Sequence, residues 1–297
     1  MIAGQASKPF LLVNPRSGDE SPTAAELREE AERLGVETHE LGLGDDARAL
    51  AREAADREAP ALGMAGGDGS LAAVAEVALE RDLPFVAVPF GTRNHFARDL
   101  GLDRDDPLGS LAAFRGDEQR VDVGLVNGSP FLNNVSLGVY AAFVHDPTRK
   151  TRNRFMAFLR MVPAALGRGR RPLELSFEVD GSRHDHLALV VLVANNDYDM
   201  TSMADLGERS GLEEGLLHAY VVEAVDRRAL LAMLARAVAG NVETSEGWVE
   251  WSSAGFRIET SRRLHAAVDG DPVILEPPLE FEIRPRGLRV LVPPARA

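Results

Sequence analysis

The sequence predicts an α/β protein with two domains: a mostly parallel sheet covered by helices, followed by a mostly antiparallel β-sandwich. In the first half, short apolar runs alternate with segments of helical periodicity, as in successive βαβ units. In the second half, apolar and polar residues alternate one by one, as in half-exposed strands. The pattern changes after Val123 without a low-complexity linker. We therefore expect two domains, over residues 1–124 and 125–297. In one version of this prediction, the last strand returns to pair within the first domain.

The first half alternates four short strands with four helices. The run PFLLVNP (residues 9–15) ends in turn residues, and the helical segment after it has Ser21 as its expected N-cap and Gly35 just past its end. The same order repeats as VETHEL before DDARALAREAADRE, PALGMA before SLAAVAEVALERD, and LPFVAVPF before NHFARDLG. Ligands of such sheets bind at the carboxyl ends of the strands, so the loops that follow the strands are the first candidates for a site.

The second half reads as antiparallel strands with one clear helix. Leu173 and Phe177 fall on one face of a strand that ends at the turn signal Asp180-Gly181. The later strand-like segments are GLLHAYVVEAV, GFRIETS, LHAAVDGDPVILE and LEFEIRPRGLRVLVP, and the helical segment is DRRALLAMLARAVAG. In HDH (residues 184–186) the two histidines share one strand face, and we interpret them as a solvated edge rather than a zinc site.

Composition restricts the classes of function. The chain has 297 residues, is 45% hydrophobic and carries a formal net charge of −13, so its overall field repels nucleic acid. It contains no cysteine, which excludes disulfides, thiolate metal sites and cysteine nucleophiles and fits a reducing compartment. No apolar run reaches the roughly 18 residues of a membrane span, and the first residues lack the order of a signal peptide. We expect a cytoplasmic protein.

The stretch GMAGGDGS places glycines and one acid between a strand and a helix. We expect the strand to end before the glycines and Ser70 to cap a helix beginning at Leu71, which would aim backbone N–H groups at an anion. Asp68 sits inside this anion site, where it would serve as a magnesium ligand or as a base for a hydroxyl. The alternative is a tight turn in which Asp68 assists the cap. No G-x-S-x-G elbow accompanies Ser70, which disfavours a hydrolase.

Two further loops end at the same edge of the predicted sheet. VNPRSG follows the first strand, and VPFGTRNHFARDLGL follows the fourth. Each loop alone is an ordinary βα turn. Together they bring four side chains to one edge that are able to hydrogen-bond a nucleotide, namely Asn14, Ser17, Thr92 and Asn94.

These three motifs, in this order and spacing, resemble the catalytic domain of diacylglycerol kinases and their relatives, the sphingosine kinases and bacterial lipid kinases. FLNNVSLGVYA, LEEGLLHAYVV, AVDGD and RGLRVLVP match the second domain of the same family in order. The resemblance implies a nucleotide-binding α/β domain, a β-sandwich domain that holds a lipid, and catalysis in the cleft between them. GGDG also occurs in NAD kinases, but PFGTRNHFARDLGL and VDGD favour the lipid branch.

The resemblance implies ATP as phosphoryl donor, Mg²⁺ as cofactor and a lipid with a free hydroxyl as acceptor. Asp68 falls on the essential acid, which we place on the phosphate side. Asp269 falls on the aspartate that activates the acceptor hydroxyl, as base or water organiser, and Asp271 closes the same element. Glu214 falls on the acid associated with structural magnesium. The expected nucleotide-binding residues are Asn14, Ser17, Gly66, Gly67, Gly69, Ser70, Gly91, Thr92, Arg93 and Asn94.

Several positions depart from the family pattern. Arg93 and His95 replace a glycine and an acid, and Asp271 is one methylene shorter than the usual glutamate. Arg93 either clamps phosphates or fills the nucleotide site. The alternatives to a lipid kinase are therefore a catalytically degenerate nucleotide- or lipid-binding protein and, with less support, an NAD kinase.

A basic segment interrupts the otherwise acidic chain. Residues 149–171 carry eight Arg or Lys side chains among apolar residues, a composition suited to transient peripheral contact with the inner face of a membrane. The alternative, which we rank somewhat higher, is a cleft-lining helix with solvated arginines. The exposed edges of a β-sandwich are also compatible with a homodimer.

Overall fold

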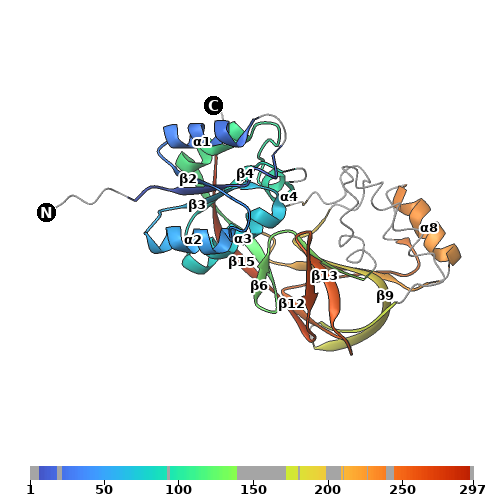
Figure 1. Cartoon of the computed structure of the whole chain (residues 1–297). Coiled ribbons are helices and arrows are strands. Elements are labelled where there is room, and N and C mark those ends of the chain that lie inside the picture. The colour runs from blue at the N-terminus through green and yellow to red at the C-terminus, as the bar shows by residue number, and fades with distance from the viewer. Residues whose placement is uncertain are drawn as a thin grey trace. The chain divides into compact units, whose positions relative to one another are not determined.

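The computed structural model of the chain is shown in Figure 1. It describes residues 7–18, 22–91, 94–138, 172–179, 181–198, 209, 211–225, 227–238 and 244–294. The chain divides into two compact units, the first formed by residues 1–121 and 286–297 and the second by residues 122–285. Strands β5 (Asp117–Val126) and β15 (Leu279–Val292) each have one end in each unit. The first unit is therefore built from both ends of the sequence.

The first unit contains a parallel sheet in the order β15-β4-β3-β1-β2. Its other strands are β1 (Phe10–Val13), β2 (Glu37–Glu40), β3 (Leu62–Gly66) and β4 (Phe85–Pro89). Every residue of β1, β3 and β4 is buried, as expected for parallel strands covered on both faces. The α/β class predicted from the alternating pattern is confirmed.

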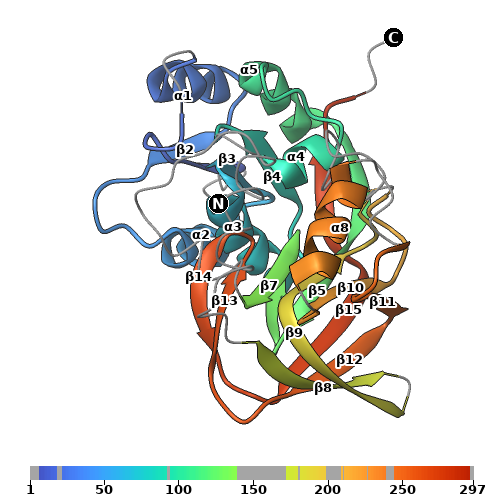
Figure 2. The ribbon, with the colours of Figure 1, turned by 90° about the vertical axis from the view of Figure 1, so that its right-hand side faces the viewer.

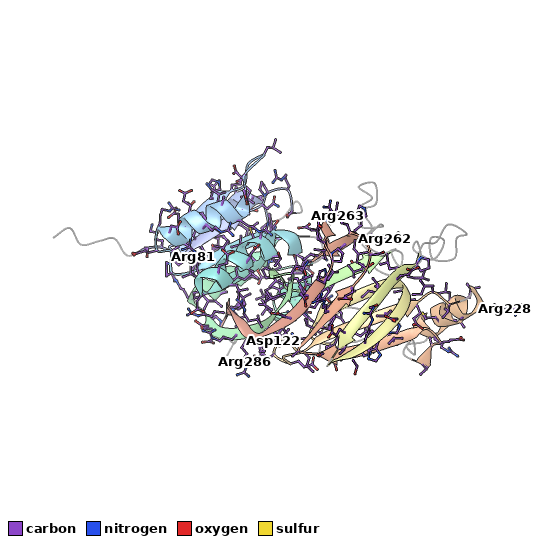
Figure 3. All side chains as sticks on the ribbon, turned by 90° about the horizontal axis from the view of Figure 1, so that it is seen from below. Arg81, Asp122, Arg228, Arg262, Arg263 and Arg286 are labelled. Atoms are coloured by element: carbon purple, nitrogen blue, oxygen red, sulfur yellow. The ribbon has the colours of Figure 1, made fainter. Side chains whose placement is uncertain are left out.

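Helices cover both faces of this sheet. Figure 1 shows α1 (Ala24–Arg33) on one face and α2 (Ala47–Asp56) with α3 (Asp68–Arg81) on the other. Arg81, labelled in Figure 3, donates from Nη2 to Asp56 at 2.7 Å and ties the ends of α3 and α2 together. The shorter helices of the unit are α4 (His95–Asp99), α5 (Pro107–Ser110) and a 3₁₀ helix over Leu111–Arg115.

Two helix starts differ from the sequence prediction. The N-cap of α1 is Thr23, which forms a reciprocal capping box with Glu26, whereas the expected cap, Ser21, lies outside the described residues. Helix α3 begins at Asp68 with Gly67 as its N-cap, so Ser70 lies inside the first turn and caps nothing. The backbone of Gly67 is extended (φ −86°, ψ 173°), so that strand β3 ends and helix α3 begins within one residue.

The second unit is antiparallel. Its sheet has the order β14-β13-β7-β9-β8-β12-β15, and β10 joins β9 to β11. The strands are β6 (Ser129–Phe131), β7 (Asn134–Gly138), β8 (Leu173–Val179), β9 (Ser182–Asn195), β10 (Leu217–Glu223), β11 (Trp248–Ser253), β12 (Gly255–Glu259), β13 (Leu264–Val268) and β14 (Asp271–Leu275). Phe131, Phe177 and Phe281 anchor its core. Figure 2 shows α8 (Arg227–Val238), the helix predicted in this half.

Two hairpins follow the predicted turn signals. Val179 pairs with Ser182 across the β8–β9 turn. Val268 pairs with Asp271 across Asp269 and Gly270, which have φ of 49° and 91°, as a type I′ turn requires. In HDH, residues 184–186 pair with β8 alone, because the pairing of β9 with β10 and β7 begins at Ala188 and Val190. His184 and Asp185 are exposed, which fits the interpretation of this segment as a solvated edge. No described helix is both long and apolar enough to span a bilayer.

Candidate functional site

Three loops of the first unit meet at the carboxyl edge of its parallel sheet, as the sequence predicts. Asn14, directly after β1, donates from Nδ2 to Ser70 Oγ at 3.2 Å, and its backbone N–H donates to Ala65 O at 2.9 Å. The N–H of Phe90, after β4, donates to Gly66 O at 3.3 Å. The loops after β1, β3 and β4 are thus in direct contact.

The closest approach is between Gly91 and Gly67. A Cβ atom on Gly91 would lie 2.5 Å from the Cα and 2.9 Å from the N of Gly67. Real Cβ atoms do not come this close to backbone, so only glycine at position 91 allows the two loops to pack in this way. At Gly67 itself a Cβ would meet no atom of the described residues within 4 Å.

Asp68 connects the starts of two helices. It lies in the first turn of α3, and its Oδ1 accepts the N–H of Phe96 at the start of α4 at 3.2 Å. The side chain is partly exposed. Its carboxylate is therefore fixed at the loop junction and still reaches solvent.

Asn94 is buried at the same junction. It is 0% exposed, has φ of 50° and donates from Nδ2 to Gly91 O at 2.7 Å. Its Oδ1 has no hydrogen-bond partner among the described residues. A buried acceptor without a donor is uncommon in folded proteins, and a hydroxyl or N–H of a bound molecule would satisfy it.

The junction also fits an anion. Among the described residues, no side chain caps α3, so the N–H groups of its first turn have no side-chain partner of the capping kind there. The positive end of the helix dipole lies at the same place and also favours an anion. A cavity of about 200 Å³ opens beside Gly91; it is lined by Pro22, Pro89, Phe90, Gly91, Arg104, Asp105 and Pro107. Ser17 is partly exposed in the loop after β1. Thr92 and Arg93 lie outside the described residues.

In the second unit, Asp269 has a structural task that the sequence did not reveal. Its Oδ2 accepts the N–H of Leu132 at 2.8 Å, and its Oδ1 accepts the N–H groups of Asn133 and Asn134 at 2.7 and 3.1 Å. The side chain is buried. Asp269 thereby fixes the loop between β6 and β7, whereas Asp271 is exposed at the first position of β14.

Arg209 supports the same loop from another part of the chain. It donates from Nη1 to Leu132 O at 2.6 Å and from Nη2 to Asn133 Oδ1 at 3.2 Å. The sequence analysis missed this residue, because Arg209 lies about 75 positions from its partners and no local pattern signals such a long-range contact.

Glu214 is engaged by hydrogen bonds. Its Oε2 accepts the backbone N–H of Asp197 at 3.1 Å and lies 3.1 Å from Nε2 of His218. The next residue, Gly215, has φ of 74° and donates to Asp122 Oδ2 at 2.6 Å. Figure 3 labels Asp122 in this unit. These contacts hold the turn before β10 in place.

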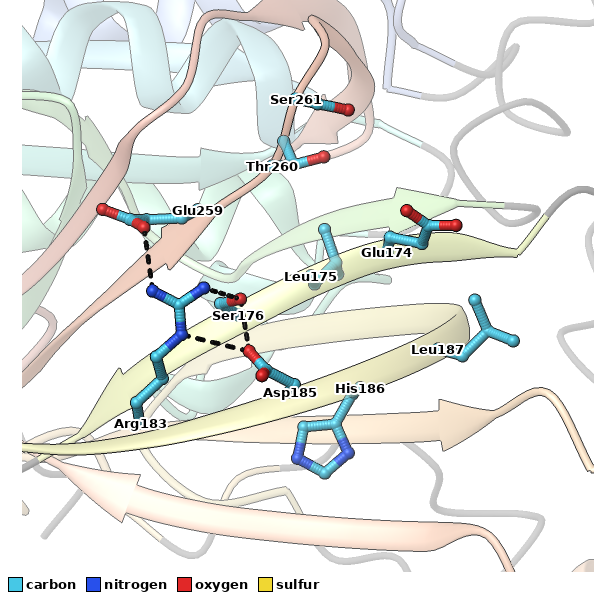
Figure 4. A pocket seen from close by; sticks show the side chains of 10 residues that line it. All are labelled: Glu174, Leu175, Ser176, Arg183, Asp185, His186, Leu187, Glu259, Thr260 and Ser261. Atoms are coloured by element: carbon cyan, nitrogen blue, oxygen red, sulfur yellow. Dashed lines mark hydrogen bonds and ion pairs between the residues drawn. The ribbon is translucent and has the colours of Figure 1, made fainter.

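A larger pocket, in the second unit, has a polar lining that does not suit the apolar part of a lipid. Its volume is about 580 Å³, and Figure 4 shows Arg183, Asp185 and Ser176 bonded to one another across it. Arg183 also reaches Glu259. Arg183 thus pairs with two of the acids that line the pocket, as in a polar surface depression rather than an apolar site.

The comparisons with known proteins identify the family. Residues 8–126 match the model of the diacylglycerol kinase catalytic domain, and residues 133–292 match the YegS C-terminal NAD kinase beta sandwich-like domain. The second match covers more than half of the chain, so the chain belongs to the family with the YegS C-terminal NAD kinase beta sandwich-like domain, and it carries a diacylglycerol kinase catalytic domain before it. Membership in this family of lipid kinases makes the chain a phosphotransferase and confirms the resemblance found in the motifs.

Relatives of this family align along most of the chain. The "Diacylglycerol kinase" of Bacillus subtilis is 25% identical over 300 residues, covering 97% of both chains. A "Probable lipid kinase YegS-like" of Pseudomonas fluorescens is 28% identical and covers 84% of this chain and 82% of its own. A crystal structure of a diacylglycerol kinase from Bacillus anthracis has a TM-score of 0.68 at 17% identity, covering 96% of this chain and 97% of that one. The last likeness shows a shared fold.

Proposed function

We propose that the chain transfers the γ-phosphoryl group of ATP, with Mg²⁺, to a hydroxyl of diacylglycerol or a related lipid. The observation that carries this proposal is the junction of the first unit, where Asp68 stands beside the uncapped start of α3 and within the loops that Gly91 and Gly67 pack together. The names of the relatives support a lipid as the acceptor.

The residues of the junction have distinct tasks in this proposal. The N–H groups at the start of α3 bind phosphate oxygens, and Asn14 with Asn94 positions the nucleotide. Asp68 is the acid that would bind Mg²⁺, and the cation would neutralise negative charge on the phosphates. Because the Phe96 N–H fixes the Asp68 carboxylate, the group is oriented before substrates bind.

Asp269 takes a positioning task. Its two oxygens accept three backbone hydrogen bonds, so the carboxylate serves to hold the loop. This favours orientation of the loop at 132–134 and of the hydroxyl over abstraction of a proton. A loose phosphoryl-transfer transition state depends on positioning and charge neutralisation more than on a strong base.

The test measures phosphate transfer from radiolabelled ATP to diacylglycerol, monoacylglycerol, sphingosine, ceramide and phosphatidylglycerol in mixed micelles with Mg²⁺. We expect Asp68→Asn to fold normally and to lose at least about 100-fold in rate, the scale seen when one preorganised charge is removed. Asp117→Asn, an exposed acid of the same unit outside the loops, is the matched control and should keep full activity.

Full activity in Asp68→Asn would refute the role of this acid. Binding of ATP without transfer to any lipid would refute the proposed reaction and support a nucleotide-binding protein. Transfer to NAD in place of a lipid would assign the chain a different acceptor.

A further inference from the structure

Three potential metal ligands converge on one face of the second unit. Asp197 follows β9, His218 lies on β10 and Glu250 on β11, and each offers a ligand atom within 4.8 Å of the other two. Tyr220 pairs directly with Glu250 in the β10–β11 register, so His218 and Glu250 are diagonal neighbours on the same face. The group is formed entirely by residues of one unit.

His218 has the geometry of a metal-binding imidazole. Its side chain is 9% exposed, and Nε2 lies 3.1 Å from Glu214 Oε2. Nδ1 has no hydrogen-bond partner among the residues that the structure describes, and it lies 3.5 Å from Asp197 Oδ1. When Nε2–H donates to Glu214, Nδ1 carries a lone pair that faces a carboxylate at the entrance of the cluster. Imidazoles that bind metals commonly donate their other N–H to a carboxylate in this way.

The two carboxylates are also held by neighbouring side chains. The Tyr220 hydroxyl donates to Asp197 Oδ1 at 2.6 Å, and the Trp248 Nε1 lies 3.5 Å from Glu250 Oε2. Each oxygen donor group therefore has a neighbouring residue that orients it.

We propose that Asp197, His218 and Glu250 bind a divalent transition-metal cation of the zinc class, with Glu214 and Tyr220 as the residues that orient the ligands. One imidazole nitrogen and two carboxylate oxygens suit Zn²⁺, with a water completing a four-coordinate shell, whereas Mg²⁺ prefers an all-oxygen octahedral shell. In the sequence, the proposed metal ligands are far from the loops that form the phosphate-binding junction. The metal site is not part of the proposed phosphoryl transfer.

Such a cation would join three segments of the second unit. Asp197 comes just after β9, and β10 and β11 supply the other ligands. A cation that binds the folded chain and not the unfolded chain stabilises the fold in proportion to the logarithm of its free concentration over Kd. The expected role is therefore structural, and the site does not require activity of the enzyme for its detection.

The test uses the full chain stripped of metal with a chelator, then titrated with Zn²⁺ in the presence of millimolar Mg²⁺. We expect one equivalent of Zn²⁺ to bind and to raise the melting temperature, and Co²⁺ at the same site to give the visible absorption of a four-coordinate ion. Glu250→Gln, at an exposed position, should weaken Zn²⁺ binding at least tenfold and lose the thermal shift, and His218→Asn should abolish both.

The matched control is His184→Gln, an exposed histidine on β9 outside the cluster, which should bind Zn²⁺ as the wild type does. If His218→Asn fails to fold, Glu250→Gln alone decides the matter. Equal affinity of wild type and Glu250→Gln, or the absence of Zn²⁺ binding to the folded wild type, would overturn the proposal.

Discussion

A methyl group at Gly91 would occupy the position where the backbone of Gly67 lies. The two glycines bring the loops after β3 and β4 together, and Asn94 and Asp68 depend on that contact for their positions. At the scale of single residues, the candidate site therefore relies on a close backbone approach as much as on polar side chains.

We expect Gly91→Ala to lower the free energy of unfolding by about 1–3 kcal/mol, the usual cost of forcing extra volume into a packed position. Denaturant unfolding measures it. Gly67→Ala is the matched control, because its Cβ would meet no neighbour in the described part of the chain and its φ of −86° suits any residue. Equal stability of the two variants would contradict the argument.

The polar residues of the site differ in how far the sequence reveals them. Asn14, Asp68 and Asn94 follow strands of a recognisable parallel pattern, so their meeting at one edge could be predicted. The three hydrogen bonds of Asp269 could not, because they join positions about 136 apart. Local patterns give the order of elements, and contacts of this range depend on the tertiary fold.

Between elements, Arg289 fixes the final strand to the rest of the first unit. It donates from Nε and Nη2 to the carboxylate of Glu118 at 2.8 and 2.6 Å, and from Nη1 to the carbonyl of Asp82 at 2.7 Å. Asp82 is the C-cap of α3. One side chain on β15 thus connects β5 with the end of a helix.

This ion pair makes a small part of stability depend on pH. The hydrogen bonds from Arg289 hold the pKa of Glu118 below its ordinary value of 4.5. The contribution is therefore fully present above pH 4.5 and is lost as pH falls through the lower pKa of the folded state.

We expect Glu118→Gln to lose up to about 0.5 kcal/mol at pH 7, since the pair is partly exposed, and to approach the wild type in stability near pH 3. Urea unfolding at both pH values measures the difference. Glu29→Gln, an exposed residue of α1, is the control and should follow the wild type at both. A difference for Glu118→Gln that persists at pH 3 would exclude this cause.

The observed helix starts show that a pattern of residue types predicts the presence of a helix but not its first residue. Ser70 and Ser21 are both common N-cap residues, yet Gly67 and Thr23 occupy those positions. Thr23 is selected by Glu26, which completes a capping box. Gly67 is selected because the strand must turn at once into α3 beside Gly91.

At the scale of the whole molecule, the first unit is completed by the last described strand. Leu288 and Val290 are fully buried, and Val290 pairs with Phe85 of β4. A fully buried aliphatic side chain contributes about 1.5–3 kcal/mol, so these two residues supply an amount comparable to much of the net stability of a typical domain.

We expect a chain that ends at Pro285 to lose the cooperative unfolding of the first unit. Calorimetry combined with limited proteolysis would show the missing transition and rapid cleavage within residues 7–121. A chain that ends at Pro294 retains all of β15 and should unfold as the full chain does. An unchanged transition in the shorter chain would show that β15 is dispensable.

The sharing of β5 and β15 also sets the order of events during synthesis. The strands β1 to β4 leave the ribosome early, but their sheet gains β15 only after the 164 residues from 122 to 285 have been made. At roughly 5–20 residues per second this delay is about 10–30 s. During that time Phe85 lacks its neighbour on β15, so nascent chains expose an unpaired, apolar strand edge on which chaperones have time to act.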